Sequence, residues 1–423
     1  MADHEAAAGT GRFPALNYRD FRVLWYGMLF ASGTMAFQYY AQMWLIYDLT
    51  DSAWLLGALG AVRGLATLLF GLYGGALADR LDRRKLLLLT QTVSLLVNMS
   101  IGLLAISGDV NLWLIFLLIF VGSASASLDA PVRQALIPEL IPQQHIPNAV
   151  ALTTAAQMGS FAITPVLAGL VIDGLGPGGA YLLSTIGNAG VLVALWLLHY
   201  RGQSTSASKE PVLLTIRTGI DYGRNQPVIL WIICLNFVTA AFGMALYNGL
   251  ITKWAGDVLM LGPGAYGLLA STWGIGTLAA SFSLSYMTEI RRPGRLMILG
   301  SLFFGLSFVA FGLTRSLPVA AFAYLINGIA WTVASIASTA IIQSIVPNEV
   351  RGRVMSLFMI NGAVANMNSL ALGAVADIVG MELMLPTSAL ICSVLVLLLA
   401  STVPVLRRLD SILDELRSQQ NGV

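Results

Sequence analysis

The sequence contains little charge. Lysine, arginine, aspartate and glutamate make up only 10% of its 423 residues, whereas they make up about a quarter of a typical soluble domain. Hydrophobic residues account for 57%, and the mean hydropathy is +0.77. Even a large soluble core could not hide this much apolar surface, so part of the surface must face lipid. The net charge of +2 gives no indication of a nucleic-acid partner.

Cysteine and histidine are also scarce, which excludes several kinds of site. Cys234 and Cys392 lie in apolar runs and provide neither a disulfide framework nor a metal-binding spacing. The three histidines are scattered. The phosphate-binding pattern GxxxxGK[ST] is absent, so direct use of ATP is not expected. Because no catalytic constellation is visible either, we expect no cofactor, no metal site and no enzymatic activity. The N-terminus shows no signal-peptide pattern.

What the sequence does contain is a series of long apolar runs. A transmembrane helix needs about 20 mainly apolar residues to cross about 30 Å of hydrocarbon. This criterion predicts an all-α membrane protein with twelve transmembrane helices, at 22–47, 54–78, 86–107, 112–134, 147–172, 180–200, 227–254, 263–287, 296–313, 318–344, 354–379 and 385–405.

The distribution of basic residues predicts the orientation. Cytoplasmic loops of membrane proteins carry an excess of lysine and arginine. If the N-terminus is cytoplasmic, only Lys253 and Arg315 fall on the outer side and only Arg63 lies deep within a helix. All other basic residues then lie on the cytoplasmic side, so we expect both termini there.

The two halves of the chain resemble each other. Three stretches align in the same order: 63–80 with 273–290, 135–142 with 340–347, and 169–173 with 373–377. Such a duplication is typical of transporters that rock one half against the other around a site at the bilayer midplane. The predicted organisation is a cytoplasmic tail at 1–20, a six-helix half at 21–200, a cytoplasmic linker with a short interfacial helix at 201–226, a second six-helix half at 227–406 and a cytoplasmic tail at 407–423.

The stretch GGALADRLDRRK at 74–85 concentrates charge in one short loop. It resembles the signature of the major facilitator superfamily, with Asp82 where glycine is usual. Two further stretches, DAPVRQALIPELIP at 129–142 and VPNEVRGRVMSL at 346–357, resemble the branch that contains enterobactin exporters and multidrug efflux proteins. The resemblance covers about 18–406 and implies the major facilitator fold, with two six-helix halves and transport by alternating access.

The resemblance also implies a latch on the cytoplasmic side. Gly71 and Gly75 would let the helix at 54–78 approach the helix at 354–379 closely. Asp79 would face the N-terminal end of that second helix, and Arg83 would pair with Asp129. The predicted gate residues are Gly75, Asp79, Arg80, Arg83, Arg84, Arg133 and Glu289. The alternative is that the basic residues only fix the orientation of the loop.

A second motif indicates export. The stretch TPVLAG at 164–169 resembles the glycine- and proline-containing motif of antiporters. It keeps Pro165 and Gly169, whereas Thr164 and Ala168 replace two glycines.

Charged residues inside the membrane require a reason, because each costs about 2.5–3.5 kcal/mol on insertion scales. Arg63 lies near the midplane, roughly 13 Å deep at the helical rise per residue. It is a candidate for holding an anionic substrate, and the alternative is an ion pair with Asp48. Asp129 shares a helix face with Arg133, four residues later. Asp129 is the first candidate for proton coupling and Asp48 the second, while a purely structural role in the latch is the alternative for Asp129.

Polar residues at helical spacing predict which helices line a substrate cavity. The candidates are Thr34, Gln38 and Gln42 in the first helix, Asn236 and Asn248 in the seventh, and Asn327, Trp331 and Ser335 in the tenth. Ordinary interhelical hydrogen bonding uses the same residue types and is the alternative.

These observations predict a proton-coupled exporter, an antiporter, of a small hydrophobic or anionic molecule such as a siderophore or a drug. A lysolipid or lipid flippase and an importer are alternatives with the same fold, and a membrane-embedded sensor or enzyme is a different class that the sequence does not favour. The expected partners are a small-molecule substrate, protons and the lipid bilayer. We expect a monomer in the cytoplasmic (inner) membrane of a bacterium.

Overall fold

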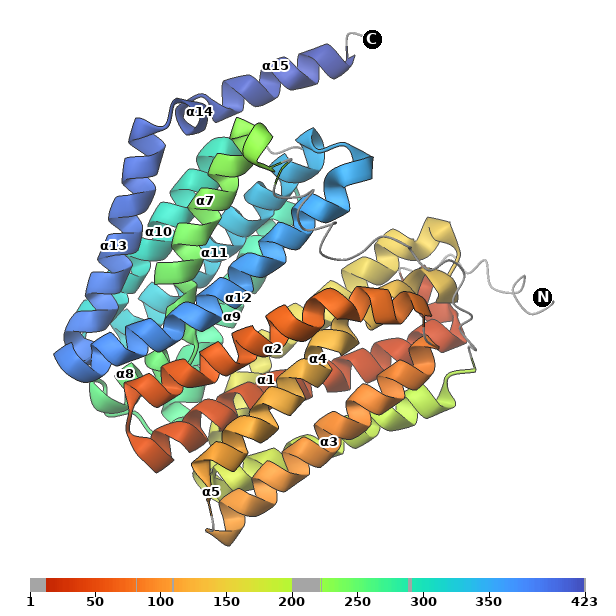
Figure 1. Ribbon diagram of the computed structural model, residues 1–423, viewed down its shortest axis with the longest axis vertical. Coiled ribbons are helices and arrows are strands. Elements are labelled where there is room, and N and C mark those ends of the chain that lie inside the picture. Colours follow the sequence, from red (N-terminus) through yellow and green to blue (C-terminus); the bar gives the residue numbers. More distant parts are fainter. Residues whose placement is uncertain are drawn as a thin grey trace. The chain divides into compact units, whose positions relative to one another are not determined.

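The computed structural model describes residues 13–421 except 81, 109, 200–220, 222 and 288–290, and it gives no side-chain placement for 72–80, 348–353, 355–360 and 416–421. The predicted interfacial helix of the linker therefore lies outside the described residues. All regular elements in the described part of the chain are helices (Figure 1).

The long helices account for the twelve predicted membrane crossings. They are α1 (Arg19–Thr50), α2 (Ala53–Arg80), α3 (Arg83–Ser107), α4 (Leu112–Leu140), α5 (Ile146–Leu197), α7 (Pro227–Phe242), α9 (Pro263–Ser285), α10 (Pro293–Leu313), α11 (Leu317–Ile345), α12 (Asn348–Val379) and α13 (Met381–Thr402). Ten spans are long and apolar enough to cross a membrane by their length and composition. One of these ten, Gln143–Leu197, covers two of the predicted helices, and α1 covers the first predicted helix. The predicted fold class of an all-α membrane protein is confirmed.

The continuous α5 is two helices joined without a loop. Gly176 has φ 69° and ψ 172°, which no helical residue adopts, and Pro177 follows it. A left-handed φ suits glycine because it lacks a Cβ, and proline is favoured at the start of a helix. The helices predicted at 147–172 and 180–200 therefore meet at a single kinked residue.

The seventh crossing is interrupted, in contrast to the continuous helix predicted at 227–254. α7 ends at Phe242, a 3₁₀ turn η3 covers Met244–Tyr247, and the short helix α8 (Leu250–Asp257) follows. Gly249 has φ 95° between η3 and α8. The reason is local, because a left-handed residue cannot continue a right-handed helix.

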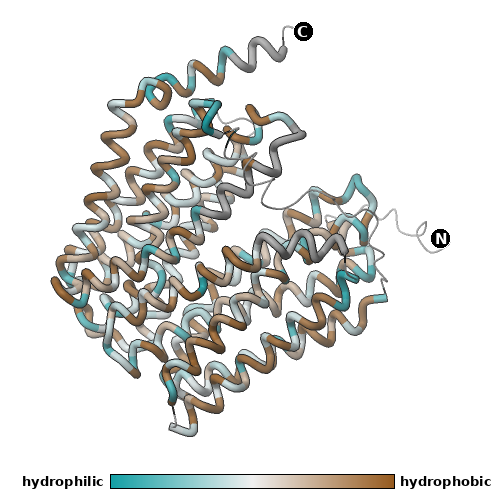
Figure 2. The backbone as a smooth tube through the Cα atoms, in the orientation of Figure 1, coloured by the Kyte–Doolittle hydropathy of each residue, from teal (hydrophilic) through white to brown (hydrophobic). Residues whose placement is uncertain are grey.

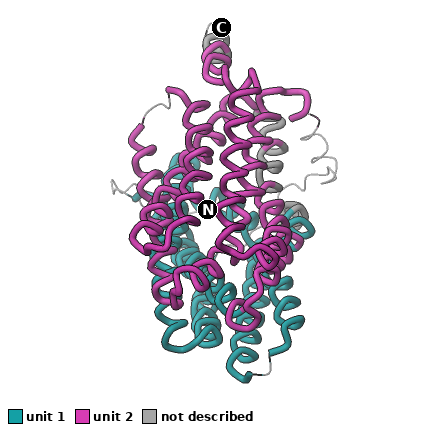
Figure 3. Tube along the Cα trace, turned by 90° about the vertical axis from the view of Figure 1, so that its left-hand side faces the viewer, with its two compact units in different colours: residues 1–45, 66–209 teal, residues 46–65, 210–423 magenta. Residues whose placement is uncertain are grey.

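Contacts between residues divide the chain into two compact units, which Figure 3 shows in different colours. Unit 1 comprises 1–45 and 66–209, and unit 2 comprises 46–65 and 210–423. The division near 209 falls within the predicted linker. The sequence did not indicate that residues 46–65, the end of α1 and the start of α2, belong to unit 2.

Each unit has its own apolar core. In unit 1, Phe21 and Leu24 of α1 pack with Leu87 of α3, Leu136 of α4 and Leu195 of α5. Many other large apolar side chains of both units are exposed. Figure 2 shows that most of the helical length is hydrophobic. Such exposure is expected of helices whose outer faces contact lipid.

In unit 2 the core extends into the C-terminal segment, which was predicted only as a tail. After α14 (Pro404–Arg407), the helix α15 (Leu409–Asn421) docks through Leu409 and Leu413, which are buried. The carboxylate of Asp410 accepts hydrogen bonds from the backbone N–H groups of Gly294 (2.7 Å) and Arg295 (3.1 Å) at the start of α10. It thereby satisfies N–H groups that have no partner inside the helix.

Candidate functional site

A buried ion pair lies in unit 1 between Asp129 and Arg133 of α4. The guanidinium donates two hydrogen bonds to the carboxylate, one from Nε and one from Nη2, the latter at 3.3 Å. Thr90 Oγ1 (3.0 Å) and Gln91 Nε2 (2.9 Å) of α3 donate to the same carboxylate. Asp129 is 7% and Arg133 6% exposed. The predicted contact four residues apart is confirmed, and the carboxylate also joins α3 to α4.

The predicted pair of Arg83 with Asp129 is wrong. Arg83 Nη1 instead donates to Glu139 and, at 3.1 Å, to the carbonyl of Ala135. The reason is register. α3 and α4 run antiparallel, so the first residue of α3 lies opposite the end of α4. Asp129 lies six residues before Ala135, or about 9 Å along the helix, and faces Thr90 and Gln91 instead.

Two other residues of the charged loop bind backbone groups within unit 1. Arg84 donates from Nε to the carbonyl of Leu195 (2.9 Å) and from Nη2 to that of Trp196 (2.6 Å), near the end of α5. Asp82 accepts hydrogen bonds from the backbone N–H groups of Arg84 (2.9 Å) and Lys85 (3.2 Å). Aspartate at this point of the signature is therefore the N-cap of α3, a role that its carboxylate suits.

Several predicted latch residues lie outside the described side chains. They are Gly75, Asp79, Arg80 and Glu289. Gly71 is described, and a Cβ placed there would lie 3.6 Å from the side chain of Thr67 in the same helix, which is an ordinary contact. The latch as a whole stays a prediction.

The polar stripe of α1 takes part in helix packing within unit 1. Gln38 donates a hydrogen bond to Asn98 of α3. Thr34 is buried, and its hydroxyl occupies the space that a Cβ at Gly187 would need. Gln42 is also buried. These contacts are of the interhelical kind that the sequence left open as the alternative, and cavity lining stays a prediction for this stripe.

The polar residues of unit 2 are bound in the same way. Asn327 is fully buried, donates to the Phe304 carbonyl (2.9 Å) and accepts a bond from the Tyr247 hydroxyl (2.8 Å). Asn236 donates to Ser338 (3.2 Å). The remaining candidates lie as follows: Asn248 donates to Asn366 (2.9 Å), Trp331 packs on Phe304, and Ser335 is half-buried.

The remaining predicted site residues lie in α5, α2 and α1. Pro165 and Gly169 lie inside α5, with Thr164 and Ala168 buried beside them. Arg63 is half-buried in the part of α2 that belongs to unit 2. Asp48 is exposed near the end of α1.

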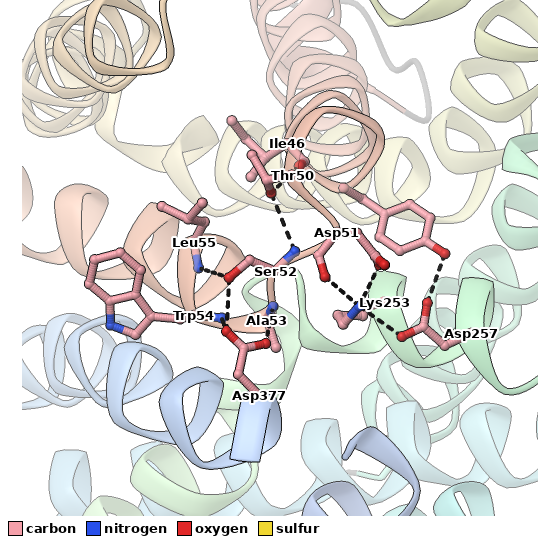
Figure 4. Close-up of polar contacts among 11 residues, drawn as sticks. Ile46, Thr50, Asp51, Ser52, Ala53, Trp54, Leu55, Lys253, Asp257 and Asp377 are labelled. Carbon is pink, nitrogen blue, oxygen red and sulfur yellow. Dashed lines mark hydrogen bonds and ion pairs between the residues drawn. The ribbon is translucent and has the colours of Figure 1, made fainter. Parts of the chain in front are cut away.

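A cluster that the sequence did not reveal surrounds the turn between α1 and α2 (Figure 4). Lys253 of α8 binds the carboxylates of Asp51 (2.6 Å) and Asp257 (2.8 Å). Asp377 of α12 accepts hydrogen bonds from the backbone N–H groups of Ala53 (2.7 Å) and Trp54 (3.0 Å). Two signals existed in the sequence: the spacing of Lys253 and Asp257, and the repeat alignment of 169–173 with 373–377, which ends on an aspartate in both copies.

In the part of the chain that the structure describes, helices of membrane-spanning length carry ion pairs and amides buried inside the bundles, which is the architecture of a multi-pass membrane protein. The chain belongs to the major facilitator family described as transmembrane secretion effector (MFS_3), whose profile matches residues 10–421. Members of this family and the relatives below are transporters, so the chain is a transporter and not an enzyme.

The chain is also similar to two individual relatives and to one solved structure. It is 24% identical over 315 residues to the enterobactin exporter EntS of Shigella boydii serotype 4 (strain Sb227), which covers 74% of each chain. It is 24% identical over 383 residues to the MFS-type transporter YfmI of Bacillus subtilis (strain 168), which covers 85% of this chain and 91% of YfmI. The POT family transporter PepTSo shares the fold, with a TM-score of 0.75 at 12% identity over 93% of this chain and 99% of that one.

Proposed function

We propose that this transporter is a proton-coupled exporter, an antiporter, of a small hydrophobic or anionic molecule such as a siderophore or a drug. The family description names secretion, and the relative EntS is named an enterobactin exporter. Both names support export rather than uptake. In this proposal the chain acts as a monomer by alternating access, in the inner membrane of a bacterium with both termini cytoplasmic.

The observation that carries the proposal is the buried Asp129 carboxylate. An ionisable group in a membrane helix is expensive and usually functional. Its charge is compensated by Arg133, and Thr90 and Gln91 donate to the same carboxylate. A proton added to Asp129 would remove its charge and weaken these hydrogen bonds, since bonds to ionised groups are the stronger ones. Because the bonds join α3 to α4, protonation would alter the packing of these two helices.

Arg63 supports the choice of an anionic or neutral substrate. It is a cation within a membrane helix, and its side chain is half-buried, with Nη1 buried. A cation attracts anions and repels cationic drugs. The predicted latch, with Asp79 opposite the N-terminal end of α12, would close the cytoplasmic side during release.

The test is transport in proteoliposomes that contain a pH-sensitive dye. The vesicles have an acidic lumen and transporters with the cytoplasmic face outward. Enterobactin, a cationic dye and a lysolipid are added in turn. The proposal requires that one small hydrophobic or anionic compound makes the lumen more alkaline as it enters. Labelled compound that enters without moving protons would contradict antiport, and a labelled lysolipid crossing in its place would indicate a flippase.

The variant Asp129→Asn tests the coupling residue. It removes the ionisable group but keeps the size, and it should abolish the pH change. Glu139→Gln is the matched control, because it makes the same type of change on the same helix in a partly exposed ion pair. If Asp129→Asn still moves protons at the normal rate, the coupling site lies elsewhere, and Asp48 is the next candidate.

A further inference from the structure

The turn between α1 and α2 is held by unit 2, although most of both helices belongs to unit 1. We call residues 46–65 the hairpin tip. α1 continues from the tip back to Arg19, and α2 continues forward to Arg80. The tip is therefore continuous with unit 1 at both of its ends, and a change in the arrangement of the units must either release the tip from α8 and α12 or bend α1 and α2.

Asp377 of α12 holds the start of α2. Its two carboxylate oxygens accept the N–H groups of Ala53 and Trp54, at 2.7 and 3.0 Å, and the hydroxyl of Ser52, at 2.8 Å. The first N–H groups of a helix lack partners within it and carry partial positive charge. Asp377 thus acts as an N-cap for α2, although it lies 324 residues after Ala53 in the sequence.

Lys253 of α8 holds the end of α1. Its ammonium donates to the carboxylate of Asp51 (2.6 Å), to the backbone carbonyl of Asp51 (2.7 Å) and to Asp257 (2.8 Å). Asp257 also accepts a bond from the hydroxyl of Tyr47 (2.9 Å). Asp51 has φ 49°, in the left-handed region that residues other than glycine rarely adopt. A strained residue persists only when its surroundings fix it, and here Lys253 binds both its backbone and its side chain.

The packing beneath these polar contacts uses small residues. A Cβ at Gly57 would overlap the carbonyl oxygen of Ser369, and a Cβ at Gly64 would lie 2.8 Å from the carbonyl oxygen of Ala363. Ser369 is fully buried and donates a hydrogen bond to the Gly57 carbonyl (2.8 Å). Glycine contacts let backbones approach but bury few side-chain atoms. Leu56 and Leu59 of the tip are also fully buried, so the charged contacts hold the tip in addition to this apolar packing.

We propose that Asp377 and Lys253 form a clasp that sets how often the hairpin tip leaves α8 and α12. Ion pairs and hydrogen bonds at exposed positions such as Asp51 and Asp377 can exchange their partners for water, so they suit a contact that opens in every transport cycle. The clasp acts at the end of α2 opposite to the predicted latch. This inference uses the transporter class and the contacts above, and it holds whichever substrate is carried and whether or not protons are coupled.

The experiment uses the full chain with Ser369→Cys, a nearly isosteric change at the centre of the glycine contact. A charged, water-soluble thiol reagent can reach this position only when the tip is away, so the labelling rate follows the population of the released form. The rate is measured for each cysteine separately by mass spectrometry of the digested protein. Cys392 is fully buried elsewhere in unit 2 and reports unfolding.

We expect Asp377→Ala to raise the labelling rate of the introduced thiol about tenfold, the change in an equilibrium that loss of a hydrogen bond to a charged group produces. Lys253→Gln should act in the same direction. Asp51→Asn should have a smaller effect, because the backbone carbonyl of Asp51 still binds Lys253. Glu382→Gln is the matched control. It removes a carboxylate from an exposed ion pair with Arg315 at the start of α13 and should leave the rate unchanged.

Two results would overturn the inference. One is an unchanged labelling rate of the introduced thiol in both Asp377→Ala and Lys253→Gln. The other is a rise at the introduced thiol that is always matched by a rise at Cys392, because the variants then unfold the unit and do not release the tip. Asp377 and Asp51 are exposed, so these two substitutions test the clasp even if Lys253→Gln misfolds.

Discussion

Asp377, at the end of α12, accepts a hydrogen bond at 2.7 Å from the backbone N–H of Ala53, the first residue of α2. The first N–H groups of a helix have no acceptor within the helix, and the carboxylate of Asp377 supplies one. The contact makes the start of α2 dependent on a residue from the other half of the sequence. It therefore affects stability as well as movement.

Asp377→Ala should lower the free energy of unfolding by about 1–2 kcal/mol, the typical cost of removing a helix cap or a hydrogen bond to a charged group. Ser52→Ala should cost less, because the N–H groups of Ala53 and Trp54 keep their acceptor. Thermal unfolding in detergent, followed by the fluorescence of the nine tryptophans, measures both. Equal stability of wild type and Asp377→Ala would show that water or another group caps α2 equally well.

The glycine contact of the hairpin tip gives a prediction of overpacking. Gly57→Ala places a methyl group against the backbone of Ser369, 2.8 Å from its carbonyl carbon. Overpacking of this kind costs about 1–3 kcal/mol. Gly33→Ala in α1 is the matched control, since nothing lies within 4 Å of a Cβ there. It should leave the unfolding temperature unchanged or raise it slightly, because alanine favours the helix. Similar losses for both variants would argue against the close approach of α2 and α12.

The ion pair of Arg83 with Glu139 allows a test of the register between α3 and α4. A double-mutant cycle between Arg83→Met and Glu139→Gln should show a coupling of about 0.5–1 kcal/mol, as residues in one ion pair do. The cycle between Arg83→Met and Asp129→Asn should show coupling close to zero. Unfolding midpoints of the single and double variants provide both values. Strong coupling of Arg83 to Asp129 alone would restore the pairing implied by the family resemblance.

The C-terminal helix should be needed for the stability of unit 2. Asp410→Ala leaves the N–H groups of Gly294 and Arg295 without their carboxylate acceptor, at a cost of about 1 kcal/mol. A chain ending before Leu409 loses in addition the burial of Leu409 and Leu413, worth about 1.5–3 kcal/mol each when complete. The truncated protein should therefore unfold at a clearly lower temperature than Asp410→Ala. Unchanged unfolding of the truncated protein would show that α15 is only loosely attached.

How much could be predicted from the sequence depends on how far apart along the chain the interacting residues lie. Hydropathy predicts each membrane helix, because the signal lies within about 20 residues. The pair of Asp129 and Arg133 is also predictable, since four residues make about one helical turn. The partner of Arg83 is not, because it depends on the register between two antiparallel helices. The docking of the hairpin tip on α12 joins residues 324 positions apart, and glycines such as Gly57 carry no side-chain pattern that names a partner.

The predicted cytoplasmic latch and the clasp should act in opposite directions. Asp79 near the end of α2 is predicted to face the start of α12, whereas Asp377 near the end of α12 binds the start of α2. If alternating access opens one end as it closes the other, Asp79→Asn should favour the state in which the tip is held. Labelling of the chain that carries Ser369→Cys should then slow, about threefold for a contribution near 0.6 kcal/mol. The variant with both Asp79→Asn and Asp377→Ala should label at a rate between those of the single variants. Faster labelling in Asp79→Asn would contradict this prediction. It would mean that loss of the latch also releases the tip, so that α2 separates from α12 at both of its ends together.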